Sequence, residues 1–174
     1  MVGMVARELR RKERAATKEE VDQILRTANV GRLGLSKNNQ PYVVPLNFFY
    51  DETGHIYVHS AESGMMIEFL ISNPTVCFEV DEYIATIPDE FTCKFDAAYR
   101  SVIVFGTARI LTDLEQRTNA LKLIVAKYAG REHAEALDTV MVDKYRSSLG
   151  SETTVIDMTI ERVTGKVGPK EASG

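Results

Sequence analysis

Short apolar runs alternate with turn clusters between Val30 and Asp81, and this alternation constrains the fold more than any other feature of the sequence. The first three runs are residues 30–35, 42–50 and 56–59, and a fourth is 75–80. The clusters 37–40 (KNNQ) and 51–54 (DETG) separate the first three runs. Runs of this length, separated by Asn, Asp and Gly, predict β-hairpins. Pro45 cannot donate to a strand ladder, which predicts a sheet edge or a bulge there.

A short helical pattern over residues 65–72 follows the third run, after the small-residue segment 60–64 (SAESG). The helix is expected to end before Pro74, because proline disfavours helical geometry in the residue before it. A helix N-terminus presents unpaired backbone N–H groups and a partial positive charge, which suit a phosphate. We therefore expect this strand, loop and helix start to be the part of the chain most able to do chemistry.

The flanking sequence predicts helices around the strands. Thr17 and Glu20 have the spacing of a capping box, ahead of one apolar helix face over residues 21–28. Further helices are predicted over 114–128, after a second capping box at 112–115 and ending at Gly130, and over 137–145. Residues 101–111, with a bulge at Gly106, and 153–160 are the fifth and sixth strand candidates. Residues 82–98 lack periodicity and are predicted to be irregular.

Six short strands with helices between and around them predict a mainly β fold with peripheral helices (α+β), built as a small antiparallel barrel. The 174 residues, 44% of them hydrophobic, are expected to form a single domain over 1–174. An amino-terminal basic arm (1–16) and a short flexible tail (167–174) flank it. The basic segment 7–14 contains two glutamates and precedes a helix, so a solvated arm or a partner-docking segment is favoured over a nucleic-acid tail.

Composition narrows the function classes. The net charge is −4, which gives no sign of electrostatic binding to nucleic acid. Two cysteines fit a reducing compartment, and no membrane-length apolar run or signal-peptide core is present, so a soluble cytoplasmic protein is expected. The three histidines have no metal-ligand spacing, and nucleotide-binding and hydrolase motifs are missing.

His59 is the histidine of interest, because it ends a strand directly before the small-residue segment. It is either a structural residue bonded to backbone or a functional residue of the loop. Met65 and Met66 have an ordinary explanation as core residues. Arg32, Arg100 and Arg109 lie in or beside strands, where they are expected to be ion-paired or exposed, although one of them could close a phosphate site.

Several segments together resemble the pyridoxamine 5′-phosphate oxidase-like split β-barrel superfamily, and within it the 5-nitroimidazole resistance (Nim) family of FMN-binding proteins. The matching segments are 30–35 (VGRLGL), 41–48 (PYVVPLNF), 57–61 (YVHSA), 73–81 (NPTVCFEVD), 99–102 (YRSV) and 106–109 (GTAR). Residues 10–14 and 164–166 extend the match, which covers nearly the whole chain. The resemblance implies a six-stranded antiparallel split β-barrel.

The resemblance also implies a homodimer with two FMN sites at the subunit interface, acting on a small-molecule substrate. Carried over residue by residue, the strand Pro45, Leu46, Asn47 and Phe48 would lie along the isoalloxazine. His59, Ser60 and Ala61 and the turn Ser63, Gly64, Met65 and Met66 would surround the ribityl phosphate. Ser101 and Val102 would approach the flavin across the interface.

One departure from the family pattern concerns the phosphate. Family members carry lysine at the two positions after the turn glycine, where this chain has Met65 and Met66. The loss of one charge-assisted hydrogen bond should weaken FMN binding by about 1.5–3 kcal/mol. Helix N–H groups would then have to hold the phosphate, or another ligand would be bound.

The sequence thus predicts a cytoplasmic, dimeric FMN flavoprotein, an oxidoreductase that reduces nitro compounds such as nitroimidazoles, with His59 as the catalytic residue. The main alternative is a non-enzymatic protein of the same fold that binds haem or another flat ligand, with His59 as a ligand. A transcriptional or interaction module is a third alternative, and only the basic arm supports it.

Overall fold

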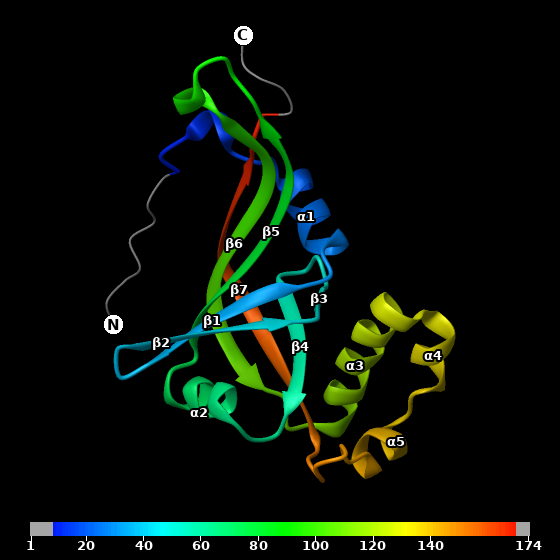
Figure 1. Cartoon of the computed structure of the whole chain (residues 1–174). Helices are drawn as coiled ribbons and strands as arrows, with labels where there is room; N and C mark the ends of the chain where they lie inside the picture. Colours follow the sequence, from blue (N-terminus) through cyan, green and yellow to red (C-terminus); the bar gives the residue numbers. More distant parts are fainter. Residues whose placement is uncertain (1–8, 170–174) are drawn as a thin grey trace.

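The computed structural model of the chain describes residues 9–169. These residues form one antiparallel sheet with helices packed against it (Figure 1). The helices are α1 (Lys18–Thr27), α2 (Met65–Ser72), α3 (Leu114–Ala129), α4 (Arg131–Ala136) and α5 (Thr139–Lys144). The strands are β1 (Gly31–Lys37), β2 (Gln40–Leu46), β3 (Phe48–Tyr50), β4 (His55–Ala61), β5 (Thr75–Ile87), β6 (Asp96–Ile110) and β7 (Thr153–Val167). No helix within this part of the chain is long and apolar enough to cross a membrane.

The strand order in the sheet is β2-β1-β5-β6-β7-β4-β3. The two edge strands, β2 and β3, are consecutive in the chain, with only Asn47 between them. Because two peptide units span less than about 8 Å, the opposite edges of the sheet must come together at this residue. The sheet therefore curls, and Asn47 marks the corner where its two edges meet.

The predicted barrel of six strands is corrected by this arrangement. The predicted second strand, 42–50, is two strands, which makes seven in total. Within residues 9–169 the hydrogen-bonded ladder leaves the sheet open between β2 and β3. The apolar run 42–50 continues on both sides of Asn47, so the sequence gives no sign that one strand ends and another begins there. Pro45 does lie in an edge strand, as predicted, where it faces Arg32 of β1.

The region predicted to be irregular, 82–98, is instead the far end of a long hairpin, and only its connection, 88–95, lies outside the strands. β5 runs on to Ile87, and β6 already begins at Asp96. Residues 81–86 are all exposed, so no buried face imposes an alternating pattern on their sequence. In Figure 1 this hairpin forms the upper end of the molecule, away from α2 and α3. A strand that is exposed on both faces lacks the alternation that would identify it in the sequence.

The helix caps follow the sequence closely. Thr17 and Glu20 form the predicted capping box at the start of α1. α3 is capped by Asp113, whose side chain accepts a hydrogen bond from the Gln116 N–H. The predicted capping box begins at Thr112, one residue earlier. α3 ends at Gly130, which has a positive φ of 98° that favours glycine. α4 was not predicted, because it is a single short segment without an apolar face.

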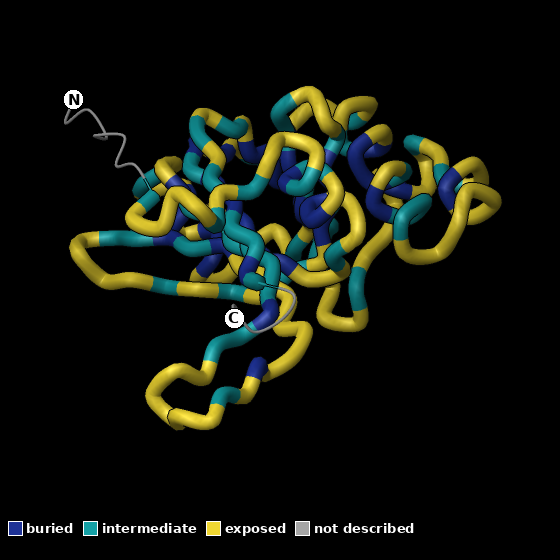
Figure 2. The backbone as a smooth tube through the Cα atoms, turned by 90° about the horizontal axis from the view of Figure 1, so that it is seen from above, coloured by how far each residue is buried: buried dark blue, intermediate teal, exposed yellow. Residues whose placement is uncertain are grey.

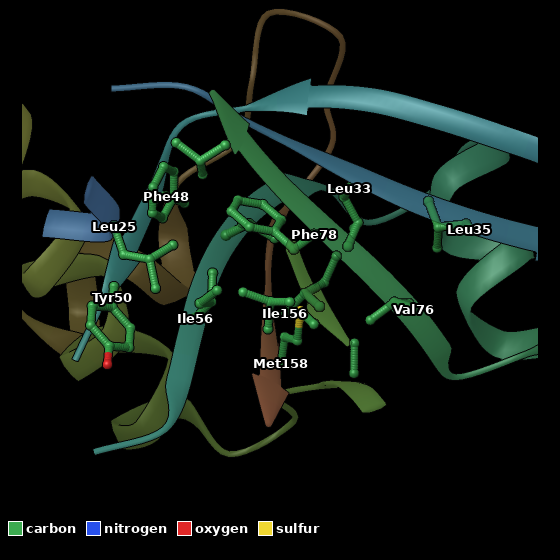
Figure 3. Close-up of a cluster of buried hydrophobic side chains, with 14 of the residues drawn as sticks. Leu25, Leu33, Leu35, Phe48, Tyr50, Ile56, Val76, Phe78, Ile156 and Met158 are labelled. Atoms are coloured by element: carbon green, nitrogen blue, oxygen red, sulfur yellow. The ribbon is translucent and has the colours of Figure 1, made fainter. Parts of the chain in front are cut away.

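The core lies between the sheet and helices α1 and α2. Leu25 of α1, Leu33 of β1, Phe78 of β5 and Ile156 of β7 meet there, and Figure 3 shows them packed together. Figure 2 shows buried residues in the middle of the molecule, with exposed segments around them. A smaller apolar cluster, which includes Leu121 and Val155, lies between α3 and the other face of the sheet.

The two ends of the described chain pack against the sheet. Arg14 forms an ion pair with Asp96, and the Ala16 N–H donates to the Gly165 carbonyl at 3.0 Å. β7 continues through Val167, so the start of the predicted flexible tail is a strand. Residues 1–8 of the predicted arm and 170–174 of the predicted tail lie outside the described residues.

Replacement of Gly106 by alanine should disrupt the predicted bulge, where the β6–β7 register does shift between Phe105 and Gly106. A Cβ at Gly106 would lie 1.9 Å from the backbone carbonyl oxygen of Thr159, which cannot move without breaking the ladder. We expect Gly106→Ala to lower the free energy of unfolding by about 3 kcal/mol or more in urea titration. Gly34→Ala is the control, because its Cβ would meet the Cys77 carbonyl oxygen at an ordinary 3.4 Å. Equal stability of the two variants would contradict this prediction.

Candidate functional site

The loop after β4 leads into a helix start without a side-chain cap. Gly64 precedes α2 with φ of 126°, a conformation that side chains other than glycine rarely adopt. Among residues 9–169, no side chain accepts a hydrogen bond from the first turn of α2. The backbone N–H groups of this turn are therefore left for solvent or a ligand, at the positive end of the helix dipole. This is the anion-binding feature that the sequence predicts.

The two methionines at the start of α2 differ in exposure. The Met65 side chain is 50% exposed, whereas Met66 is 7% exposed and belongs to the core. A lysine at position 65 would reach a phosphate on the helix start, while a lysine at position 66 would have to be buried. Among the predicted phosphate-site residues, Ala61, Ser63 and Gly64 are exposed and Ser60 is half-buried.

The corner at Asn47 lies beside the end of β4. Phe48 of β3 pairs with Val58 of β4, so the next position in this register sets Asn47 across from His59. The Asn47 side-chain amide donates to the Asn29 carbonyl at 3.0 Å. Pro45 is exposed and Leu46 half-buried. The register thus sets the corner beside the end of β4, one short loop before the start of α2.

Three of the predicted site residues have side chains in the core. Phe48 and Val102 are fully buried, and Met66 is only 7% exposed. The Phe48 ring packs edge-on against Phe78, with 5.0 Å between the ring centroids. Any contact of these three residues with a ligand would come from their backbone.

Ser101 and Val102 are far from His59 along the strands but nearer to Leu46 across them. On β7, Ser101 pairs with Lys166, whereas His59 pairs with Val155, which is 11 residues or roughly 35 Å of strand away. Across the sheet, Leu46 pairs with Gly31, the β1–β5 register sets Gly31 beside Val80, and Val80 pairs with Val102. Val102 is therefore three strand spacings, roughly 15 Å, from Leu46.

His59 makes no side-chain hydrogen bond to any residue in 9–169, so the expected structural role as a loop anchor is not seen. Its side chain reaches the surface, yet protein atoms crowd the ring. The resulting desolvation lowers the pKa of His59 below its ordinary value of 6.5. The ring is therefore neutral at pH 7, with one nitrogen able to donate and the other to accept.

The three arginines considered from the sequence are all ion-paired. Arg32 pairs with Glu79 at 2.9 Å and Arg100 pairs with Glu82 at 2.5 Å. Arg109 pairs with Asp157 at 2.8 Å. They thus follow the ordinary interpretation, and none of them is left unpaired to close a phosphate site.

Sequence reasoning missed the cluster around Asp157. This carboxylate is only 2% exposed and lies on β7 between two partners. His55 Nδ1 is 2.7 Å from Oδ1, and Arg109 Nε and Nη2 are 3.2 and 2.8 Å from Oδ2. The available signal was an aspartate inside the apolar run 153–160, where a charge requires a partner. Among residues 9–169, His, Cys, Asp and Glu form no group of three that could hold a metal ion.

Lys127, near the end of α3, was also missed. Its ammonium group donates to the Ala28 carbonyl at 2.6 Å and lies 4.0 Å from the centroid of the Phe48 ring. Burial lowers the pKa of Lys127 to about 8. This partly buried cation packs on the corner from the side of α3.

Residues 17–167 match the family model described as pyridoxamine 5′-phosphate oxidase. No curated protein matches the sequence significantly. Among solved structures, a candidate 5-nitroimidazole antibiotic resistance protein from Bacteroides thetaiotaomicron is 24% identical, with 88% of this chain and 86% of that chain covered and a TM-score of 0.67.

Two further solved structures share the fold. The flavocytochrome Anf3 from Azotobacter vinelandii is 20% identical, with 96% and 75% of the two chains covered and a TM-score of 0.76. An FAD-binding protein from Mesorhizobium loti is 26% identical, with 90% and 97% covered and a TM-score of 0.62. The likeness to these chains extends over nearly all of this one.

The environment of His59 predicts a pH dependence of stability. The folded chain holds a pKa below 6.5 and the unfolded chain one near 6.5, so the unfolded state binds more protons between these values. The contribution of His59 to stability is therefore present above pH 6.5 and is lost as the pH falls through the folded pKa. We expect the wild type to lose more stability than His59→Gln between pH 7.5 and 5, measured by urea unfolding. An NMR titration midpoint of the His59 ring at or above 6.5 would contradict this.

Proposed function

The chain belongs to the pyridoxamine 5′-phosphate oxidase family, and from this we propose that it is a flavin-dependent oxidoreductase that binds FMN at the corner formed by Asn47, His59 and the start of α2. The observation that carries the proposal is the uncapped start of α2 at the end of β4, beside the corner. A phosphate requires hydrogen-bond donors that converge on it, and a flat ring requires an exposed surface next to them. Both lie in the same region of the chain.

The residues present fit a flavin phosphate through backbone N–H groups rather than through a cation. The first turn of α2 supplies the N–H groups, and the exposed Ser63 adds a hydroxyl donor. The lysine pair of the family pattern is missing, and Met65 occupies the exposed position instead. We therefore infer weaker FMN binding than the family pattern provides, with the helix start as the main phosphate contact.

The ring of the cofactor would lie along the corner, at Pro45 and Asn47. Bound FMN supplies hydride transfer, and the protein binds and orients it. The neutral His59 ring would donate one hydrogen bond and accept another at the flavin or the substrate. The proposed substrates are nitro compounds such as nitroimidazoles. The Nim-like motifs and the fold shared with the Bacteroides protein support this choice.

A second copy of the chain would complete the site. Ser101 of the second copy would approach the flavin at the corner of the first, as the family resemblance implies. One face of the sheet carries the exposed Ile103, whose strand neighbours are Glu79 and Thr164. Apolar side chains in the middle of an exposed sheet face are covered in a dimer. The proposal therefore includes a cytoplasmic homodimer of split β-barrels with the flavin at its interface.

Absorption spectra and cofactor titrations of the purified protein test the proposal. A flavin spectrum and saturable FMN binding are the expected results. Preferential binding of FAD would change the cofactor, and a Soret band with no flavin binding would favour the haem alternative, with His59 as its ligand. Haem ligation would use the neutral imidazole that the lowered pKa provides.

Met65→Lys should tighten FMN binding by about fivefold or more, because it adds a cation at an exposed position beside the phosphate. Fluorescence titration with FMN measures the change, and riboflavin, which lacks the phosphate, should show little effect. Ile71→Lys is the control, because it adds a lysine to the far end of α2 at a side chain that is 71% exposed. Equal affinities of Met65→Lys and Ile71→Lys for FMN would place the phosphate elsewhere.

Ile103→Glu should convert the dimer to a monomer, because it places a charge in the middle of the proposed interface. The wild type is expected to sediment at twice the 19.5 kDa of one chain and the variant at 19.5 kDa. Leu149→Glu, at a loop position that is 93% exposed, should leave the dimer intact. A wild type that sediments as a monomer at micromolar concentration would overturn the dimer.

A further inference from the structure

A cleft separate from the corner lies between α3 and the sheet. Its volume is about 210 Å³, below the roughly 300–1,000 Å³ of pockets for drug-sized ligands. Tyr57 of β4, Arg109 of β6 and Asp157 of β7 line one wall, and Gln116 and Asn119 of α3 line the other. Leu111 and Leu123 contribute apolar surface. The cleft therefore suits a small ligand with a polar end and an apolar end.

Arg109 is held at the cleft by the buried carboxylate of Asp157. Its Nε and Nη2 both donate to the single oxygen Oδ2, at 3.2 and 2.8 Å, while His55 occupies Oδ1. The Nη1 group makes no hydrogen bond within residues 9–169, and the side chain is 62% exposed. Both oxygens of Asp157 have partners, so its charge is compensated, and the free edge of the guanidinium faces outward.

Three further polar groups at the cleft have no partner among the described residues. They are the hydroxyl of Tyr57 and the side-chain amides of Gln116 and Asn119. Burial and the nearby Asp157 raise the pKa of Tyr57, so its hydroxyl keeps its proton at neutral pH and can donate. A guanidinium edge, a hydroxyl and two solvent-exposed amides therefore stand as donors at one small cleft.

We propose that this cleft binds a small carboxylate that carries a short apolar or aromatic group. The carboxylate would accept hydrogen bonds from Arg109, whose planar guanidinium suits a two-oxygen acceptor. Tyr57 and Asn119 would donate to the same group. The apolar part would lie against Leu111 and Leu123. The site uses none of the residues proposed to hold FMN.

Benzoate is a suitable probe, and benzamide is its neutral counterpart of nearly the same shape. In ¹H–¹⁵N NMR titrations of the full chain without FMN, we expect benzoate to shift the Asn119 and Gln116 side-chain signals and to saturate in the millimolar range. Benzamide should bind at least tenfold more weakly. Asn119→Leu should weaken benzoate binding at least fivefold, and Tyr57→Phe, which removes only one oxygen, at least twofold.

Glu115→Gln is the matched control, because Glu115 is an exposed residue of α3 that does not line the cleft, and its benzoate affinity should stay unchanged. If benzoate causes no shifts at a concentration about 20 times the expected dissociation constant, the proposal is overturned. Equal binding of benzamide, or unchanged affinity in both Asn119→Leu and Tyr57→Phe, would do so as well. FMN titration of the same variants keeps the two proposals apart, since loss of benzoate binding with normal FMN binding concerns this cleft alone.

Discussion

The hydroxyl of Tyr128 secures the corner at which the chain passes from one edge of the sheet to the other. The Phe48 N–H donates to this hydroxyl at 2.9 Å. The hydroxyl oxygen of Tyr128 in turn lies 2.7 Å from the Asn29 carbonyl oxygen and 3.0 Å from the Phe48 carbonyl oxygen, as a donor to them. A strand that breaks off leaves backbone groups without ladder partners, and leaving them unpaired costs free energy. One side chain of α3 supplies those partners. Tyr128 thereby ties Phe48 of β3 to Asn29, which lies just before β1, at the corner where the sheet edges meet.

The sequence predicts local structure well where a single residue determines it. Thr17 and Glu20 define the start of α1, and Gly130 defines the end of α3, because capping depends on side chains a few residues apart. The break at Asn47 could not be predicted, since its cause is Tyr128, which lies 80 residues from Phe48 in the chain. The long hairpin was missed for a different reason. Its β5 arm is exposed on both faces over residues 81–86, so burial imposes no pattern on their sequence.

The candidate site is proposed on segments that are each contiguous in the sequence, and its outline stays a prediction. What the sequence could not show is which side chains face outward. Phe48 and Val102 fall within matched motifs and Met66 stands in the proposed phosphate turn, yet all three face the core. The Asp157 cluster illustrates the opposite case. His55, Arg109 and Asp157 come from three strands, and Asp157 is 102 residues from His55, so only the sheet register brings them together.

Helix α3 links the corner with the cleft, and this determines how large a ligand the cleft can accept. Its 16 residues span about 24 Å. At one end Arg117 donates to the Thr153 carbonyl at 2.7 Å, and at the other end Lys127 and Tyr128 bond to Ala28 and Asn29. Each such hydrogen bond contributes about 1 kcal/mol, and the Lys127 cation gains further from the Phe48 ring. To lift α3 from the sheet would break several of these contacts and release the corner as well. The cleft is therefore held near the size that it has, and selection at Arg109 is for small molecules.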